Sequence, residues 1–244
     1  MSSQERPGRI ADSCASPTGR YRTSLLAIAA ACAVAGLLAF TIDLPVARWC
    51  ARRPSPLPGD LLKLLNLAEV FAHGVGVAAL VATLLVSDPA LALPLPGRPA
   101  GARGNFLRLA GAAAVGGLLA DLVKACVERV RPNSADLAHL ESAFGTFGSD
   151  ALSAPLTHAA QIMSFPSGHA AAAAGLAAAL GWKYPHGRPA FATLAVLSAA
   201  QRVATSAHYP SDVCFGAAVG LVAAAVLVGG GQPWTRSVAR ADGT

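Results

Sequence analysis

The sequence predicts an all-α integral membrane protein, a bundle of six transmembrane helices with a candidate active site at the outer, periplasmic membrane face. Two observations predict this fold class. Hydrophobic residues make up 54% of the 244 residues and charged residues only 13%, about half the charged share of a typical soluble domain. The apolar residues are also gathered in six runs, several of them close to the minimum of about 17 residues that crosses a bilayer.

The six runs cover residues 24–42, 70–86, 106–125, 166–182, 189–204 and 213–229. The first run resembles a signal peptide, but no clean small-x-small cleavage site follows it closely, so we expect an uncleaved span. The last three are rich in Ala and Gly, which favours close packing between helices. We therefore expect one six-span domain over residues 24–230, between polar cytoplasmic tails at 1–23 and 231–244.

Two connections between the runs are long. Residues 87–104 are rich in Pro and Gly, and residues 133–161 carry five ionisable side chains, Asp136, His139, Glu141, Asp150 and His158. Loops of this length inside a compact protein are usually functional or mobile.

The net charge of +6 comes from 19 Lys and Arg against 13 Asp and Glu. In a membrane protein such an excess is more typical of topology and anionic head groups than of nucleic-acid binding. With the N-terminus inside, eleven of the 19 basic residues fall on the inner side and eight on the outer side. The bias predicts cytoplasmic N- and C-termini, and the Ala- and Arg-rich composition suggests a bacterial inner membrane.

The five cysteines form no CxxC pair and predict no zinc site. A disulfide between Cys50 and Cys126 is conceivable if both face an oxidising compartment.

Ionisable residues stand at the ends of the third, fourth and fifth spans. Lys124 and Arg131 are seven residues apart, close to two helical turns, which predicts one helix face before Pro132 ends the helix. By themselves these cations could equally be interfacial side chains that snorkel to water. Asp121, one turn before Lys124, could be a simple ion-pair partner.

The second cluster is Pro166-Ser167-Gly168-His169, at the start of an Ala-rich run. Ser167 is a candidate N-cap, and the free amides of the first helical turn can bind an anion. An ordinary helix cap with an incidental interfacial His is the alternative.

The third cluster runs from Arg202 to His208 and Asp212 across a turn. An Asp four residues beyond a His can accept a hydrogen bond from one ring nitrogen and leave the other free as a base or nucleophile. Alternatively, Asp212 only caps a helix and His208 lies on the surface.

Together the clusters favour a phosphate site without a metal, because three cations, helix amides, two histidines and one carboxylate fall on the same membrane side. Cations and amides suit phosphoryl oxygens, and two histidines can supply a nucleophile and a proton donor.

Lys124-x6-Arg131-Pro132, Pro166-Ser167-Gly168-His169 and Arg202-x5-His208-x3-Asp212 resemble the three ordered motifs of the type 2 phosphatidic acid phosphatase superfamily. This superfamily contains membrane lipid phosphate phosphatases, related to vanadium haloperoxidases and bacterial acid phosphatases. The resemblance covers about residues 60–230.

The resemblance implies a role for each motif residue and no cofactor. His208 would be the nucleophile that forms a phosphohistidine, Asp212 would orient it, and His169 would protonate the leaving group. The residues that would bind the phosphoryl group are Lys124, Arg131, Ser167, Gly168 and Arg202. Gln201 departs from the pattern, because the family often has Ser before the third-motif Arg.

Three functions remain open from the sequence. The first is a metal-independent phosphatase acting on a lipid phosphomonoester or diphosphate, of the phosphatidic acid or undecaprenyl pyrophosphate type. The others are a non-catalytic lipid-binding or transport protein and a vanadate-dependent haloperoxidase. Glu69 and His73 either line the substrate path or form an interfacial pair, whereas His139 and His158 match no motif.

Overall fold

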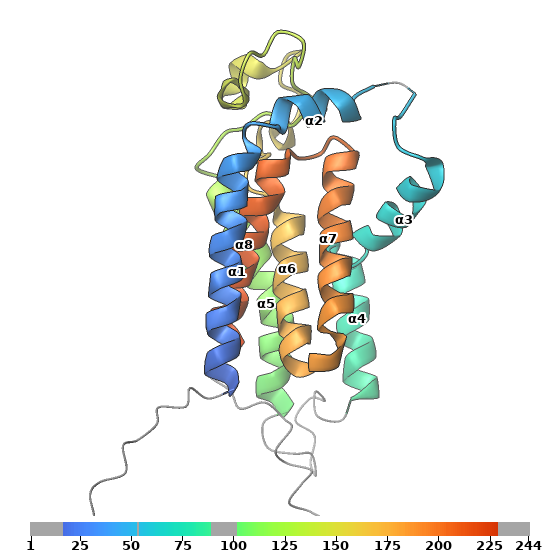
Figure 1. Cartoon of the computed structure of the whole chain (residues 1–244), viewed down its shortest axis with the longest axis vertical. Helices are drawn as coiled ribbons and strands as arrows, with labels where there is room; N and C mark the ends of the chain where they lie inside the picture. Colours follow the sequence, from blue (N-terminus) through green and yellow to red (C-terminus); the bar gives the residue numbers. More distant parts are fainter. Residues whose placement is uncertain (1–16, 53, 89–101, 229–244) are drawn as a thin grey trace, which may run out of the picture.

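The structure is a computed structural model that describes residues 17–52, 54–88 and 102–228, and within these ranges its regular elements are all helical. Most of the chain lies in one upright bundle (Figure 1). The α-helices are α1 (Pro17–Ala39), α2 (Asp43–Cys50), α3 (Gly59–Glu69), α4 (Gly74–Ser87), α5 (Ala102–Lys124), α6 (Gly168–Lys183), α7 (Arg188–Ala204) and α8 (Pro210–Val228). Short 3-10 helices are η1 (Ala143–Thr146), η2 (Ser149–Ala151), η3 (Ala159–Ile162) and η4 (Pro185–Gly187).

Successive long helices of the bundle run in opposite directions. Helices α1, α5 and α7 end at the upper end of the view, where α6 and α8 begin, and α2 lies across that end (Figure 1). Helix α3 leans away from the bundle and meets α4 at a bend of 62°. The connections after α1, α5 and α7 therefore lie at one end, as the sequence predicted for its outer connections.

The six predicted apolar runs each correspond to a helix or, for 70–86, to part of the bent pair α3 and α4. Among the described residues, three helices are long and apolar enough to cross a membrane, Thr18–Ala39, Asn105–Lys124 and Pro210–Val228, and the bent pair makes a possible fourth. Helices α6 and α7 have only 16 and 17 residues. The structure thus supports an integral membrane protein with three or four candidate spans.

Small residues let α5, α6 and α8 pack closely. A Cβ added to Gly216 would collide with the carbonyl oxygen of Ser167, and one added to Gly220 would collide with that of Ala171. A Cβ on Gly116 would lie 3.0 Å from the same Ala171 oxygen. Backbones in direct contact leave no room for a side chain, so the Ala- and Gly-rich composition serves close helix packing, as the sequence predicted.

Some boundaries differ from the sequence prediction. Helix α1 begins at Pro17, seven residues before the predicted span, because Thr18 to Thr23 continue the helix. The loop at 133–161 contains η1, η2 and most of η3. No disulfide bond joins Cys50 and Cys126. Residues 1–16, most of the 87–104 loop and the tail at 231–244 lie outside the described residues.

Candidate phosphate-binding site

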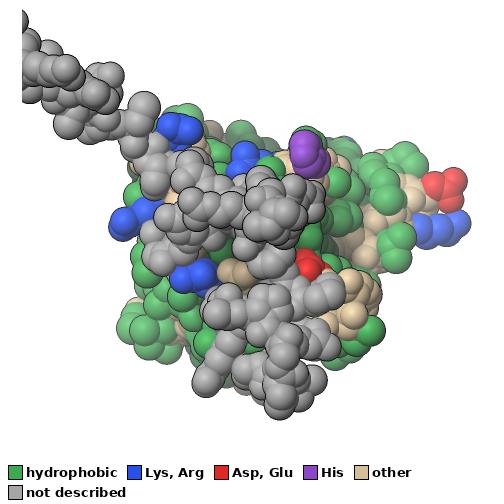
Figure 2. Space-filling view, turned by 90° about the horizontal axis from the view of Figure 1, so that it is seen from below, with side chains coloured by type: hydrophobic (Ala, Val, Ile, Leu, Met, Phe, Trp, Pro, Cys, Tyr) green, Lys and Arg blue, Asp and Glu red, His purple; other side chains and the backbone are tan. Residues whose placement is uncertain are grey.

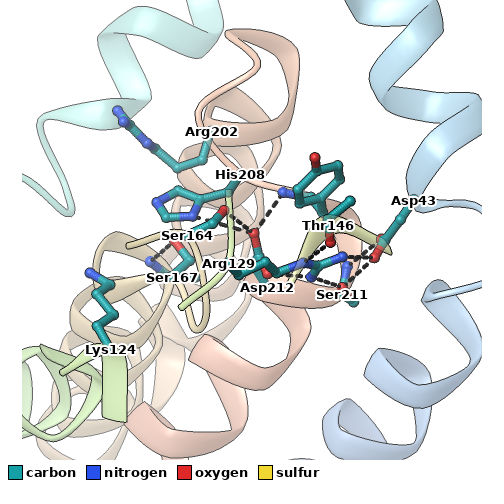
Figure 3. A network of polar contacts seen from close by, with 12 residues as sticks. Asp43, Lys124, Arg129, Thr146, Ser164, Ser167, Arg202, His208, Ser211 and Asp212 are labelled. Carbon is teal, nitrogen blue, oxygen red and sulfur yellow. Dashed lines mark hydrogen bonds and ion pairs between the residues drawn. The ribbon is translucent and has the colours of Figure 1, made fainter. Parts of the chain in front are cut away.

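The three predicted clusters meet (Figure 3) at the end of the bundle where α2 lies (Figure 1). Lys124 ends α5, Ser167 precedes α6, Arg202 lies in the last turn of α7, and His208 and Asp212 flank the start of α8. Figure 3 shows Lys124, Ser167, Arg202 and His208 near one another although they come from four segments of the chain.

Lys124 reaches the start of α6. Its Nζ would be 3.1 Å from a Cβ added to Gly168, so a larger residue there would crowd the ammonium group. The same Nζ is 2.9 Å from Oδ1 of Asp121, and the Lys124 side chain is 13% exposed. The ion pair considered from the sequence is therefore present, and it holds the cation beside the Gly168 amide.

Arg131 does not share a helix face with Lys124, and that prediction was wrong. Helix α5 ends at Lys124, and Arg131 lies in an extended segment whose amides bond to the loop instead of to the preceding turn. Arg131 N donates to Gln161 O at 2.8 Å, and Arg129 N donates to Ile162 O at 2.8 Å. This tertiary pairing replaces helical hydrogen bonds and ties the first cluster to the residues just before the second.

Ser167 is the N-cap of α6, as predicted. Its backbone is extended, and its Oγ accepts a bond from the Ala170 amide at 3.4 Å. The Ser167 amide donates to Asp212 O at 2.9 Å, so the start of α6 is anchored to α8. The amides of Gly168 and His169 are in the first turn, where helix geometry provides no intrahelical acceptor.

His208 and Asp212 form the predicted pair. His208 Nδ1 lies 3.6 Å from Asp212 Oδ2, and both side chains are buried. This separation is longer than a formed hydrogen bond, which is common in sites without substrate. Burial lowers the pKa of His208 below its usual value; Asp212 opposes this shift, whereas Arg131 and Arg202 add to it. These influences together favour the neutral ring, the form in which a nitrogen lone pair can attack.

Arg202 is bound by Glu69, a carboxylate whose role could not be decided from the sequence. Its Nη1 donates to Glu69 Oε1 at 2.6 Å. Gln201 Nε2 donates to the other oxygen, Oε2 of Glu69, at 3.0 Å. His169 Nε2 lies 3.9 Å from Glu69 Oε1, and the rings of His169 and His73 are 6.2 Å apart. Glu69 therefore lies beside Arg202 and His169, and His73 lies next to His169.

Two guanidinium nitrogens remain without a protein acceptor. The Nε atoms of Arg131 and Arg202 are buried and have no hydrogen-bond partner among the described residues. Burial, with the nearby charge of Arg202, also lowers the pKa of Arg131. Buried donors without partners are costly, and repelling cations favour an anion between them, so this arrangement can bind phosphate.

Behind Asp212 lies a buried network whose members the sequence analysis did not assign to the site (Figure 3). Arg129 is fully buried, and its Nη1 donates to Asp212 Oδ1 at 2.6 Å while its Nη2 donates to Asp43 Oδ2 at 2.7 Å. Asp43, directly after an apolar run, was a usable signal, because a carboxylate next to a membrane span usually has a partner. The partner could not be identified from sequence, since Asp43 and Arg129 are far apart along the chain.

An apolar groove with a volume of about 320 Å³ runs along α6. Ala170, directly after His169, lies at one end, and the groove continues along α6 to Ala178 between α1, α7 and α8. Its walls are mostly Ala, Leu, Ile and Val side chains. Hydrocarbon is the chemistry that such a surface accommodates.

The chain is similar to known proteins. Residues 105–236 match the family model described as the PAP2 superfamily. A lipid A 1-phosphatase of Rhizobium johnstonii is 38% identical over 104 residues, which are 43% of this chain and 38% of that protein. One of Rhizobium etli is 39% identical over 104 residues, 43% of this chain and 40% of that protein. The chain thus covers less than half of these relatives, and no solved structure matches it.

Proposed function

Because the chain belongs to the PAP2 superfamily, we propose that it is a metal-independent phosphatase that hydrolyses a phosphomonoester or diphosphate of a membrane lipid. One observation carries the proposal: two buried guanidinium nitrogens that have no acceptor in the described part of the chain lie at the same end of the bundle as the His208–Asp212 pair and the start of α6. An anion site beside a neutral imidazole is suited to phosphoryl transfer.

In the proposed reaction, Lys124, Arg131 and Arg202 bind the phosphoryl oxygens together with Ser167 and the Gly168 amide. His208 Nε2 attacks phosphorus, the bond from phosphorus to the ester oxygen breaks, and His169, protonated beside the bound phosphate, gives that oxygen its proton. A water then attacks the phosphohistidine while His169 accepts a proton, which releases phosphate and restores His208. The cations supply the charge stabilisation that a metal ion provides in other phosphatases.

The groove beside Ala170 supports a lipid rather than a soluble phosphate ester as substrate. A hydrocarbon chain there would lie along α6 with its phosphate at the helix start. Phosphatidic acid and polyprenyl pyrophosphate fit this description, and the names of the two Rhizobium relatives add glycolipid phosphates of the lipid A type.

We further propose six membrane spans, with both termini in the cytoplasm and the site at the periplasmic face of a bacterial inner membrane. The end of the molecule opposite the site supports this orientation, because several Lys and Arg side chains are visible from that side among hydrophobic ones (Figure 2). Cytoplasmic ends of membrane helices carry this excess of positive charge.

The test is phosphate release by the purified protein from a panel of lipid phosphates in the presence of EDTA. We expect turnover that vanadate inhibits, and loss of at least about 10³-fold in kcat in His208→Ala, because the nucleophile is gone. His139→Ala, which removes an exposed histidine whose ring contacts Asp136, is the matched control and should leave kcat unchanged. Full activity of His208→Ala would exclude His208 as nucleophile, and loss of activity in EDTA would exclude the metal-free mechanism.

A further inference from the structure

The network behind Asp212 contains two carboxylates and one guanidinium, all removed from solvent. Asp43, Arg129 and Asp212 are each 0% exposed. Besides its bonds to the two carboxylates, Arg129 donates a hydrogen bond to Ser211 Oγ at 2.7 Å and another to Thr146 Oγ1 at 2.8 Å. With His208 neutral, the cluster carries a net charge of −1, and a positive charge on the ring would balance it.

Each oxygen of Asp212 has a separate task. Oδ1 accepts from Arg129 at 2.6 Å. Oδ2 accepts from Ser164 Oγ at 2.6 Å and from the Tyr209 amide at 2.9 Å, and it faces His208 Nδ1 at 3.6 Å. If Arg129 had no other anion, its charge would cancel that of Asp212 and weaken the attraction between Asp212 and a charged His208 ring.

Asp43 supplies that other anion. It comes from α2, and besides the Arg129 bond its Oδ1 accepts from the Ser211 amide at 3.0 Å. Aromatic rings close the space around the guanidinium, with Tyr209 at 4.2 Å and Phe147 at 4.8 Å from Arg129 Cζ. Because these groups have no exposed surface, the interactions among their charges are screened far less than at a surface.

We infer that Asp43 is a positioning residue for phosphoryl transfer: by neutralising Arg129, it leaves the negative charge of Asp212 to stabilise the positive charge that His208 acquires. The inference rests on the proposed function, because the ring becomes cationic when Nε2 bonds to phosphorus while Nδ1 keeps its proton. The other charged or titratable groups around His208 are Arg131 after α5, Arg202 on α7 and His169 on α6. None of them is changed by substitution at Asp43.

The experiment compares Asp43→Asn with Thr146→Val. Asp43→Asn removes the negative charge of Asp43, whereas Thr146→Val removes one hydrogen bond of Arg129 and leaves every charge in place. We expect Asp43→Asn to lower kcat by about tenfold or more, with KM within about twofold of wild type, and to move the acid limb of the pH profile of kcat/KM downward by about one unit. Thr146→Val should lower Tm without moving that limb.

A measurement that needs no turnover accompanies the kinetics. In the full-length protein with ¹⁵N-labelled histidine, the His208 signals are identified by their loss in His208→Gln, and their pH titration is followed. The titration of His208 should shift to lower pH in Asp43→Asn and stay near wild type in Asp43→Glu, which keeps the charge. Asp43→Ser repeats the neutral substitution with a smaller side chain, so failure of one variant to fold does not remove the comparison.

The outcomes separate the inference from the proposed function. If the wild type releases no phosphate from any lipid, the proposed function fails, and the titration still tests the charge coupling. If the wild type is active but both neutral variants titrate like Thr146→Val, or if they raise KM and leave kcat unchanged, Asp43 has only a structural role and the inference is overturned.

Discussion

At the scale of single residues, His208 depends on opposing influences. Burial and the cations Arg131 and Arg202 favour its neutral form, and Asp212 favours its charged form. A nucleophilic histidine needs both, because it must be neutral before attack and cationic afterwards. The surrounding charges therefore suit a ring whose charge changes during a reaction.

The pKa of His208 leads to a testable pH dependence. A pKa below the usual 6.5 means that the ring binds a proton only at lower pH, so activity that needs the neutral ring should extend below pH 6.5 before it declines. In Arg131→Gln one cation that lowers the pKa is gone, and we expect the acid limb of kcat/KM to move upward, toward 6.5. The measurement is a pH profile on a lipid phosphate.

Lys124→Gln is the matched control for this profile, since it also removes a phosphate-binding cation but is not among the groups that shift the pKa of His208. Both variants should raise KM. An acid limb that moves equally in both, or in neither, would contradict the assignment of the limb to His208.

Glu69 is the residue whose position in the site was least expected. Its carboxylate holds Arg202 at 2.6 Å, and the side chains of both are partly exposed, 29% for Glu69 and 14% for Arg202. Gln201, the departure from the family pattern, donates to Glu69 and to Asn66. The amide therefore has a structural use here: it helps to hold the carboxylate beside Arg202.

Glu69 binds Nη1 of the same guanidinium whose Nε, unpaired within the described chain, would bind a phosphoryl oxygen, so its negative charge opposes the binding of an anion there. We expect Glu69→Gln to lower the inhibition constant of vanadate about threefold or more, since the Gln keeps the shape and loses the charge. Vanadate titration of turnover checks this. Asn66→Ala is the control, because it removes an acceptor of Gln201 without changing any charge, and it should leave the inhibition constant near wild type. Weaker inhibition by vanadate in Glu69→Gln would contradict the prediction and show that the carboxylate mainly orients Arg202.

At the scale of helices, the site depends on how closely α6 approaches α8. Gly216 on α8 lies against the carbonyl of Ser167, and the Ser167 amide bonds to Asp212 O at 2.9 Å. The distance between the two helices therefore sets the distance between the α6 start and the His208–Asp212 pair. A small change in packing would separate the binding and reacting groups.

Gly216→Ala tests this dependence. Its Cβ would meet backbone that cannot move independently, so we expect a loss of about 1–3 kcal/mol in stability together with a fall in kcat. The measurements are thermal unfolding in detergent and turnover. Gly117→Ala on α5, where the nearest atom to an added Cβ is Ala172 Cβ at 4.0 Å, should be tolerated. Equal losses of stability and kcat in both variants would contradict the idea that the contact of Gly216 with the Ser167 carbonyl positions the site.

At the scale of the whole molecule, the helices place the candidate site at one end and the η4 turn between α6 and α7 at the other (Figure 1). In the proposed orientation these ends face the periplasm and the cytoplasm. Ala154, in the loop near the site, and His186, in η4, are both exposed, which makes them suitable reporters of the two ends.

The orientation can be tested by cysteine labelling in a variant whose five native cysteines are replaced. A membrane-impermeant maleimide should label Ala154→Cys in cells whose inner membrane is intact, because that end faces the periplasm. It should label His186→Cys only after the inner membrane is permeabilised. The reverse pattern would invert the topology, and labelling of both in intact cells would exclude opposite sides.

The helical class and the meeting of the three clusters could be predicted from sequence, for a local reason. Apolar runs, an N-cap Ser167 and a His208–Asp212 spacing across a turn are properties of neighbouring residues, and antiparallel helices joined in order bring alternate connections to the same end. The position of Arg131 was predicted wrongly, because the local sequence allows a helix to continue past Lys124. In the structure the backbone amides of this segment bond instead to the carbonyls of Gln161 and Ile162 in the loop.

The residues found only in the tertiary structure are held by partners distant in sequence. By itself, the sequence determined the apolar helices and the order of the motif residues, since both follow from side-chain type and spacing. The tertiary structure decided that Glu69 meets Arg202, that Asp43 and Asp212 share the buried Arg129, and that the bend between α3 and α4 leaves three or four candidate spans. Which charges share a buried space depends on how the helices pack, and burial then makes each of those pairings matter energetically.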